Sequence, residues 1–203
     1  MLNDISILNI REYLSSNNKN LGEEQLQQVL SDFLCKKNAD VQRFLKEQSI
    51  DFTKKNQSVT YLVFSDEDAE LLGYFTIAIK PISINADKFS NTLKRKIARV
   101  SELDCTTGEY TLSAYLIAQL GKNYTNNANK KIAGEQLLQA AINAIKELQY
   151  MAGGMVVFLE AEQNEKLMNF YKCENGFKEF STRETQSKNG DEYQLVQLLK
   201  VLQ

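Results

Sequence analysis

The stretch that most constrains the fold is an apolar strand, a polar loop and the start of a long helix, which follow one another from Tyr110 onward. The strand is predicted over 110–119, and the loop over 122–131 is rich in Asn and Lys. The helix is expected to begin between Ile132 and Gly134. A helix N-terminus leaves backbone N–H groups unpaired and carries a partial positive charge. After a strand, such a turn is a candidate anion site, most often for phosphate.

The long helix is predicted to pack on a sheet. Its apolar residues form two adjacent rows, and together these make a stripe wide enough to require burial against strands. The rows are Leu137, Ala141, Ala144 and Leu148, and Leu138, Ile142 and Ile145. Gly153 and Gly154 are expected to stop the helix, and the apolar run Met155–Leu159 is typical of a strand covered on both faces. Strand, helix and strand make a βαβ unit, so the two strands are predicted to be parallel.

The other elements are shorter and are predicted from apolar spacing and turn residues. In chain order they are a strand at 5–10, helices at 23–33 and 39–46 (the second capped by Asn38), a β-hairpin over 60–64 and 71–79 with Gly73 as a bulge or close-approach point and Pro81 as its end, a basic helix at 93–100, a helix at 164–172, and strands at 177–181 and 193–201 around a polar turn at 188–191.

Composition narrows the classes of function. The chain has 203 residues and a net charge of −2. A chain of this size buries enough surface to fold as one domain without a disulfide or a bound metal to stabilise it. The acidic balance argues against broad nucleic-acid binding, so a nucleic-acid partner is not expected. The chain has no histidine, which removes the commonest metal ligand and the commonest general base. We therefore expect no metal, and neither Ser-His nor Cys-His catalysis.

Cysteine usage and hydropathy suggest the cellular setting. The cysteines Cys35, Cys105 and Cys173 are odd in number and unclustered, which favours free thiols in a reducing compartment. No apolar run approaches the roughly 20 residues of a membrane span. Asp4 and Arg11 interrupt the region where a signal peptide would be apolar. These patterns predict a cytoplasmic protein without a membrane partner.

Two segments carry finer patterns. The first is Asn129-Lys130-Lys131-Ile132-Ala133-Gly134, at the turn where the loop meets the helix. The second begins at the end of the following strand with Leu159-Glu160-Ala161-Glu162-Gln163-Asn164, and continues to the pairs Phe170-Tyr171 and Gly176-Phe177. The second segment is the more specific of the two, because it combines two residue pairs with the spacer between them.

The order of elements and these two segments resemble the GNAT family of acetyl-CoA-dependent N-acetyltransferases. The layout agrees over the whole chain and the motifs over 114–177. The resemblance implies an α/β fold with a GNAT-like mixed, mostly antiparallel twisted sheet of about seven strands and helices on both faces. It also implies a single acetyltransferase-like domain over 1–203, with the central strand, phosphate loop and helix at 110–150 and a thiolate-side segment at 155–177.

The resemblance also implies where acetyl-CoA binds. In the family, its pyrophosphate lies on a loop with Gln or Arg, two residues, Gly, one residue, then Gly or Ala. Asn129 stands at the Gln/Arg position, Ile132 replaces the first glycine, and Gly134 matches the last small residue. The pantetheine arm lies along the backbone of the central strand as an added strand would. The expected cofactor-binding residues are Ile117, Ala118, Gln119, Leu120, Asn129, Lys130, Lys131, Ile132, Ala133, Gly134 and Asn164.

Tyr171 stands where the family has a tyrosine that protonates the departing thiolate of CoA. The chemistry fits, because a phenol with a pKa near 10 can donate a hydrogen bond or a proton to a thiolate whose thiol has a pKa near 8.5. With no histidine, a carboxylate or a water relay must accept the proton of the amine. Glu160 resembles the glutamate after the same strand in the ribosomal-protein N-terminal acetyltransferase branch of the family, and Glu162 and Glu109 are the alternatives.

The sequence therefore predicts an N-acetyltransferase that moves the acetyl group of acetyl-CoA directly to a primary amine of an unidentified acceptor, either a small molecule or a protein. Two alternatives stay open. One is a toxin of the same fold that acetylates aminoacyl-tRNA, with Lys94, Arg95, Lys96 and Arg99 lining a positive groove. The other is a catalytically degenerate CoA- or partner-binding module, which the β-branched Ile132 supports. A homodimer is also left open.

Overall fold

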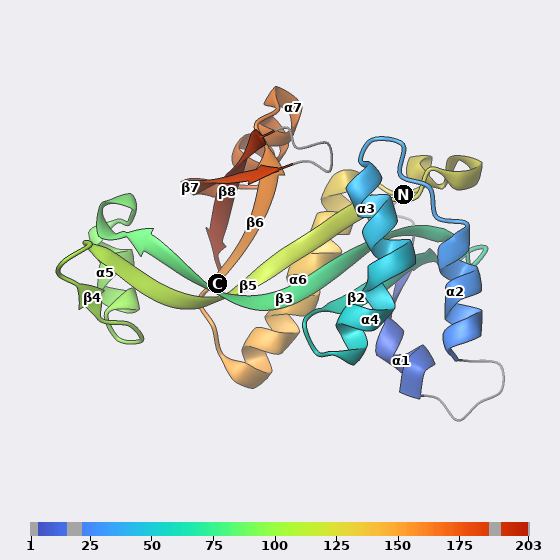
Figure 1. Cartoon of the computed structure of the whole chain (residues 1–203), viewed down its shortest axis with the longest axis horizontal. Helices are drawn as coiled ribbons and strands as arrows, with labels where there is room; N and C mark the ends of the chain where they lie inside the picture. Colours follow the sequence, from blue (N-terminus) through green and yellow to red (C-terminus); the bar gives the residue numbers. More distant parts are fainter. Residues whose placement is uncertain (1–3, 16–21, 187–191, 203) are drawn as a thin grey trace. The chain divides into compact units, whose positions relative to one another are not determined.

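The computed structural model describes residues 4–15, 22–186 and 192–202, and Figure 1 shows their strands and helices. The strands are β1 (Ile5–Asn9), β2 (Val59–Ser65), β3 (Leu71–Asn85), β4 (Leu103–Asp104), β5 (Glu109–Lys122), β6 (Val156–Glu162), β7 (Lys178–Gln186) and β8 (Glu192–Val201). The α-helices are α1 (Ile10–Ser15), α2 (Glu23–Ser31), α3 (Ala39–Arg43), α4 (Ser49–Lys54), α5 (Asn91–Ile97), α6 (Gly134–Ala152) and α7 (Glu165–Met168). Two π-helical turns, η1 (Phe44–Gln48) and η4 (Asn169–Glu174), and two 3₁₀ turns, η2 (Ala86–Lys88) and η3 (Thr125–Lys130), accompany them.

The strands form one sheet with the order β1-β2-β3-β5-β6-β8-β7, and β4 pairs with β5. β5 and β6 are parallel, with Tyr115 opposite Val157. The pairs β1–β2, β2–β3, β4–β5, β6–β8 and β7–β8 are antiparallel. The mixed, mostly antiparallel α/β sheet is confirmed, with eight strands among the residues that the structure describes rather than about seven. The additional strand β4 has two residues, which is too short for a periodic pattern to indicate.

Contacts within the chain divide it into two compact units. Unit 1 comprises Met1–Ala78 and Ile117–Glu147, and unit 2 comprises Ile79–Leu116 and Leu148–Gln203. Each unit has a hydrophobic core of its own. Three elements, β3, β5 and α6, continue from one unit into the other. We therefore propose, as the sequence predicted, that both units belong to a single domain.

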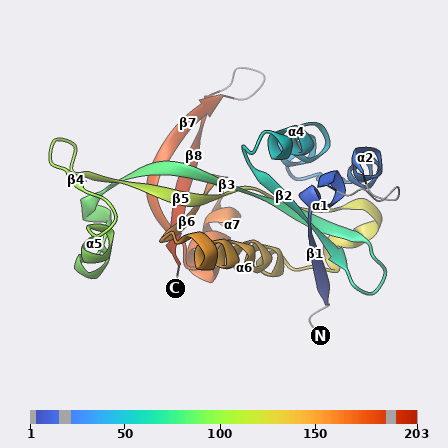
Figure 2. The ribbon, with the colours of Figure 1, turned by 90° about the horizontal axis from the view of Figure 1, so that it is seen from below.

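In unit 1, helices cover both faces of the sheet. Successive residues of a strand point to opposite faces. Tyr74 of β3 lies in a core with Leu30 of α2 and Val41 of α3, whereas its neighbour Gly73 faces Leu137 of α6. Figure 2 shows α2 and α4 on one side of β2 and β3, and α6 on the other. Of the predicted α6 stripe, Ala144 and Leu148 are half-buried, and the other members are buried: Leu137, Leu138, Ala141, Ile142 and Ile145.

Two glycines let backbone and side chains approach closely in unit 1. A Cβ on Gly73 would lie 2.6 Å from the carbonyl oxygen of Gly121, and a Cβ on Gly121 would lie 2.4 Å from Cγ1 of Val41. Neither position has room for a side chain. The register between β2 and β3 also shifts between Val63, which pairs with Gly73, and Phe64. The close approach predicted as one of two roles for Gly73 is therefore confirmed, and the extra residue of the register shift is its neighbour Leu72, since Gly73 itself pairs with Val63.

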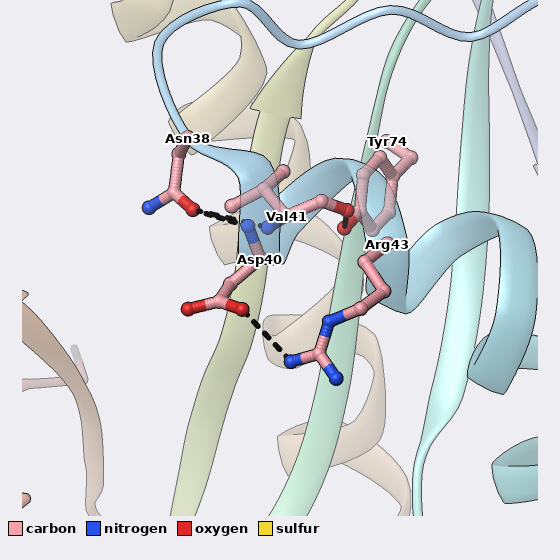
Figure 3. Close-up of polar contacts among 5 residues, drawn as sticks. All are labelled: Asn38, Asp40, Val41, Arg43 and Tyr74. Carbon is pink, nitrogen blue, oxygen red and sulfur yellow. Dashed lines mark hydrogen bonds and ion pairs between the residues drawn. The ribbon is translucent and has the colours of Figure 1, made fainter. Parts of the chain in front are cut away.

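The first turn of α3 is fastened to the sheet, as Figure 3 shows. Asn38 caps the helix as predicted, because its side chain accepts hydrogen bonds from the N–H groups of Asp40 and Val41. The buried hydroxyl of Tyr74 on β3 donates a 2.5 Å hydrogen bond to the carbonyl of Val41. Asp40 and Arg43 form a 2.8 Å ion pair. The cap and the tyrosine together fix where α3 begins and how far it lies from β3.

Unit 2 has a separate core that includes Ile84 of β3 and Ile97 of α5. β3 passes through Pro81 and continues to Asn85, so the prediction that Pro81 ends the hairpin was wrong. The physical reason is the length of the neighbouring strand. β2 begins opposite Ile77, so β3 is an edge strand beyond that pair, where a proline only has to place its missing N–H on the unpaired side.

Two predicted helices differ from the structure in form. The helix expected over 39–46 is α3 followed by the π-helical η1, and the helix expected over 164–172 is α7 followed by the π-helical η4. One extra residue in a turn leaves the apolar spacing nearly unchanged, so the sequence pattern does not reveal it. The helix stop at Gly153 and Gly154 is confirmed, because α6 ends just before them and both have positive φ. The turn predicted at 188–191 lies outside the described residues.

Candidate functional site

The loop between β5 and α6 lies in unit 1 and is fixed at its base by the buried Asn123. The Asn123 side chain donates a hydrogen bond to the carbonyl of Leu71 and accepts two from backbone N–H groups, at 2.8–3.1 Å. Asn126 and Asn127 then adopt left-handed conformations, with φ of 50° and 65°, which asparagine tolerates better than most residues. The loop thus follows a defined path up to the predicted anion site.

Ile132 is the residue at which the chain departs from the family pattern. Its side chain is 2% exposed, so it points into the protein and not out from the turn. A glycine is required in a phosphate loop only where a side chain would block the approach of the ligand to the backbone. Because the isoleucine side chain is buried, it places no atoms on the outer surface of the turn. Asn129 is half-buried at the end of η3.

α6 begins at Gly134, within the predicted range. The N–H of Ala133 donates a 2.8 Å hydrogen bond to Oε1 of Gln136, which is one half of a capping box. The first helical bond from α6 to the residue before it runs from the N–H of Leu137 to the carbonyl of Ala133. The N–H groups of Gly134, Glu135 and Gln136 precede that bond and have no carbonyl four residues back inside the helix. One amide of the predicted anion site is therefore already used by Gln136.

The two lysines of the turn have different surroundings. Lys131 forms ion pairs with Asp68 and Glu70, in the turn between β2 and β3. Its hydrogen bonds with these carboxylates raise the pKa of Lys131, and the bond from Lys131 lowers the pKa of Asp68 to about 2. Lys130 is exposed and takes part in no ion pair with the residues that the structure describes. The positive charge of Lys130 is thus available to an anion, whereas that of Lys131 is balanced by two carboxylates.

β5 carries the predicted backbone contacts. Its pairs with β6 are Tyr115–Val157 and Leu116–Phe158. The four predicted contact residues follow directly after Leu116. They are Ile117, which is buried, and Ala118, Gln119 and Leu120, which are half-buried. Their role as an edge for the pantetheine arm stays a prediction.

Tyr171 lies in the π-helical η4 of unit 2. Its ring is flanked by the rings of Phe170 and Phe177, with centroids 5.0 and 6.0 Å away. Burial raises the pKa of the Tyr171 phenol to about 12, although the residue keeps part of its surface accessible. Among the described residues, none forms a hydrogen bond with its hydroxyl. The phenol is therefore protonated at neutral pH, and its hydroxyl can donate to a ligand.

The turn that carries Tyr171 is closed by Asn175. The N–H and the side-chain amide of Asn175 both donate to the carbonyl of Phe170, at 3.1 and 2.8 Å. The N–H of Phe177 donates to the carbonyl of Tyr171 at 2.9 Å, and Nζ of Lys200 donates to the carbonyl of Asn175 at 2.9 Å. These bonds hold the backbone on both sides of the phenol.

Asn164 caps the short helix α7. Its side chain accepts a 2.9 Å hydrogen bond from the N–H of Lys166, and its own N–H donates to the carbonyl of Glu162 at 2.7 Å. The side chain thus has a local structural role. Its predicted contact with acetyl-CoA stays a prediction.

Glu160, the predicted base, accepts three hydrogen bonds. Nε and Nη2 of Arg183 donate to its Oε1 and Oε2, at 2.9 and 2.6 Å, and Nε2 of Gln197 donates to Oε1 at 2.8 Å. Strand register explains this meeting, because Glu160 of β6 lies opposite Gln197 of β8, and β7 with Arg183 is the next strand. The hydrogen bond to Glu160 raises the pKa of Arg183. Of the two alternative bases, Glu162 is exposed and Glu109 is half-buried.

Four residues that hold the loop, the start of α6 or the side chain of Glu160 in place were not identified from the sequence. Gln136 carried a usable signal, because a glutamine three residues after a helix cap is part of a capping box. Asn123, Arg183 and Gln197 carried none, since they bond to residues far away along the chain. Over the described ranges, no group of three or more His, Cys, Asp or Glu side chains is placed to hold a metal ion. No helix in those ranges is both long and apolar enough to cross a membrane.

No protein-family model matches the sequence, and no curated protein matches it. Solved structures match over almost the whole chain. AtaT complexed with acetyl-methionyl-tRNAfMet is 16% identical, with a TM-score of 0.61 over 95% of this chain and 94% of that one. A tyrosine-to-phenylalanine mutant of KacT is 18% identical, with a TM-score of 0.61 over 97% and 94%. A tyrosine-to-phenylalanine mutant of the AtaT toxin is 17% identical, with a TM-score of 0.56 over 98% of this chain and 93% of that one. It is bound to the C-terminus of the antitoxin AtaR and to acetyl-CoA.

This chain has the GNAT fold. The fold class that the motifs implied is thereby confirmed. In this GNAT fold, β5, the loop, α6 and β6 form the predicted βαβ unit, and the π-helical turn with Tyr171 follows β6 through α7.

Proposed function

We propose that the protein is an N-acetyltransferase that moves the acetyl group of acetyl-CoA directly to a primary amine. The observation that carries this proposal is Tyr171, an enclosed phenol with a pKa of about 12 whose hydroxyl has no hydrogen-bond partner among the described residues. Further support comes from the fold, because a neighbour that shares it is bound to acetyl-CoA. Two neighbours are also tyrosine-to-phenylalanine mutants, and that substitution removes only a hydroxyl.

In the proposed reaction the amine nitrogen attacks the thioester carbonyl. A C–N bond forms, the C–S bond breaks, and CoA leaves as a thiolate. Because the pKa of Tyr171 is raised, the phenol stays protonated throughout the working pH range and donates a hydrogen bond to the developing thiolate. Much of the rate comes from holding the amine and the thioester together.

We assign the diphosphate of acetyl-CoA to the segment Asn129–Gly134. The first-turn amides of α6 and the exposed Lys130 support this assignment, since both attract an anion. A diphosphate that takes the N–H of Ala133 has to displace the side chain of Gln136. The pantetheine arm is assigned to the backbone of Ile117–Leu120.

The proton of the attacking amine is assigned to a water relay. Glu160 was the predicted base, but its two oxygens already accept three hydrogen bonds from Arg183 and Gln197. A carboxylate held in this way is better suited to shape a binding site than to collect a proton. We therefore propose Glu160 as a positioning residue.

A second, narrower candidate is acetylation of aminoacyl-tRNA. One neighbour of the same fold is complexed with acetyl-methionyl-tRNAfMet. The expectation that this protein has no nucleic-acid partner is therefore not supported. That expectation used the total charge, which averages over local clusters. The basic residues of α5 are such a cluster, and Arg95, Lys96 and the following Arg99 are exposed. A solvated helix face carries such charges too, so this candidate needs its own test.

Two measurements test the proposal. Calorimetry with acetyl-CoA establishes binding, and an acetylation screen over polyamines, aminoglycosides, amino acids, peptides and aminoacyl-tRNA establishes transfer. Binding without transfer to any amine would identify a degenerate CoA-binding module, and absence of binding would refute the proposal. Growth arrest on expression that Tyr171→Phe relieves would support the aminoacyl-tRNA candidate.

A further inference from the structure

Unit 2 contains a cavity of about 450 Å³, within the range of about 300–1,000 Å³ that small-molecule sites occupy. β3, β5, β6, β7 and β8 all contribute to its wall, and every lining residue belongs to unit 2. Leu116, Phe158 and Phe180 form its apolar part, and the two phenylalanine rings pack edge to face with centroids 6.3 Å apart. None of the residues assigned above to acetyl-CoA lines this cavity.

The polar wall of the cavity is the network of Glu160, Arg183 and Gln197. The carboxylate of Glu160 is balanced by the guanidinium of Arg183, with which it forms two hydrogen bonds. A guanidinium has five N–H donors, so Arg183 retains donors for a ligand after these two bonds. The side chain of Arg183 is half exposed and that of Glu160 is 22% exposed. The wall thus presents more donors than acceptors.

Lys80 adds a second cation to the lining. It is exposed on β3, and none of the ion pairs formed by the described residues includes it. With Lys80 and Arg183 against Glu160 alone, the charged groups of the lining sum to +1. Such a cavity attracts an anionic group and repels a polycation, because charges across a few ångströms are only partly screened by salt.

We infer that this cavity receives the acceptor, and that the amine is carried by a molecule with an apolar part and an anionic oxygen group, either a carboxylate or a phosphate. The inference rests on the proposed function and narrows its substrate class. The apolar part packs on Leu116, Phe158 and Phe180, and the anion lies between Lys80 and Arg183. Polyamines and aminoglycosides are excluded as acceptors, since they bring several positive charges to a positive wall.

The test uses two pairs of probes that carry the same amine with and without an anion. The pairs are leucyl-glycine against leucyl-glycinamide, and puromycin 5′-phosphate against puromycin. Calorimetry on the full-length protein, with and without bound CoA, measures Kd for each probe. At least one anionic probe is expected to bind about fivefold more tightly than its partner, which is typical of one charge-assisted contact at a partly exposed site. The pair that shows the preference identifies the anion as carboxylate or phosphate.

The variants separate charge from folding. Lys80→Gln removes a cation that holds no ion pair with the described residues, so the fold is kept and the preference is expected to fall below about twofold. Lys178→Gln removes an exposed cation of β7 outside the cavity and is expected to keep the preference. Equal or weaker binding of both anionic probes, an unchanged preference in Lys80→Gln, or no binding of any probe overturns the inference. Failure of the proposed function is seen separately, as absence of acetyl-CoA binding and of transfer to any amine.

Discussion

The guanidinium of Arg183 holds the carboxylate of Glu160 through two hydrogen bonds, of 2.9 and 2.6 Å. Such a two-point contact fixes the plane of both groups. Gln197, on the strand between them in the sheet, adds a third bond to the same carboxylate. The three residues therefore form a rigid polar wall, and this geometry favours a positioning role for Glu160 over that of a base.

Glu160→Gln distinguishes these two roles by the size of its effect. A glutamine oxygen can still accept from Arg183, so we expect kcat to fall less than about tenfold, whatever the change in KM for the acceptor. Loss of a general base typically costs about 100- to 10,000-fold. Steady-state kinetics with the best acceptor measures both constants. Glu184→Gln, an exposed carboxylate of β7, is the matched control, and a fall in kcat above a hundredfold would restore Glu160 as the base.

Gln136→Ala tests whether the start of α6 is the diphosphate site. The variant loses the hydrogen bond from the N–H of Ala133 to the Gln136 side chain, so we expect the free energy of unfolding to fall by about 0.5–1 kcal/mol. Because this amide no longer has to be released, we expect acetyl-CoA to bind as tightly as before or about threefold more tightly. Denaturant unfolding and calorimetry measure the two effects. Gln139→Ala, further along the exposed face of the same helix, is the control. A Gln136→Ala variant that binds acetyl-CoA less tightly would contradict the assignment.

Asp68→Asn changes the charge of the same turn. Because the hydrogen bond from Lys131 lowers the pKa of Asp68 to about 2, the carboxylate is ionised at every pH of an activity assay. Its removal takes away one of the two carboxylates, Asp68 and Glu70, that form ion pairs with Lys131, and the turn becomes more positive. We expect acetyl-CoA to bind about two- to fivefold more tightly at low salt, with the gain lost at high salt. Calorimetry at two ionic strengths measures this. Asp66→Asn, a second acidic residue of the same turn region, is the control, and tighter binding in that variant alone would argue against the role of Lys131.

The long periodic segments were predictable from the sequence. The stripe of α6, the glycine stop after it and the apolar run of β6 all depend on local spacing, and they specify a βαβ unit with parallel β5 and β6. Pro81 shows where local reasoning fails, because its tolerance depends on where the neighbouring strand β2 begins. The π-helical turns fail in the same way, since tertiary packing decides where one extra residue is inserted.

The candidate site was predictable as a list of residues but not as a set of contacts. The segment Asn129–Gly134 and Tyr171 were indicated by short motifs. No local pattern showed that Lys131 is engaged by Asp68 and Glu70, or that Glu160 is held by Arg183. These contacts join residues on different strands and turns, so they follow from register and not from spacing. The burial of Ile132 likewise depends on how the loop folds back on unit 1.

The raised pKa of Tyr171 has a consequence for stability at high pH. The phenol has a pKa of about 12 when folded and about 10 when unfolded. Because the unfolded chain loses this proton first, the contribution is fully present below pH 10 and is lost as the pH rises from about 10 to about 12. Between pH 9 and pH 11 we expect the wild type to lose about 1 kcal/mol more than Tyr171→Phe. Denaturant unfolding at the two pH values measures this, and equal losses would show that the phenol is not enclosed in solution.

The most direct test of the central claim is the effect of Tyr171→Phe on turnover and on acetyl-CoA affinity in the same preparation. The variant keeps the ring contacts with Phe170 and Phe177 and loses only the hydroxyl, and Tyr193→Phe on β8 serves as the control. If the phenol assists departure of the thiolate, kcat falls by about 100- to 1,000-fold while Kd for acetyl-CoA changes less than about twofold. An unchanged kcat, or a loss of affinity as large as the loss of turnover, would contradict the account.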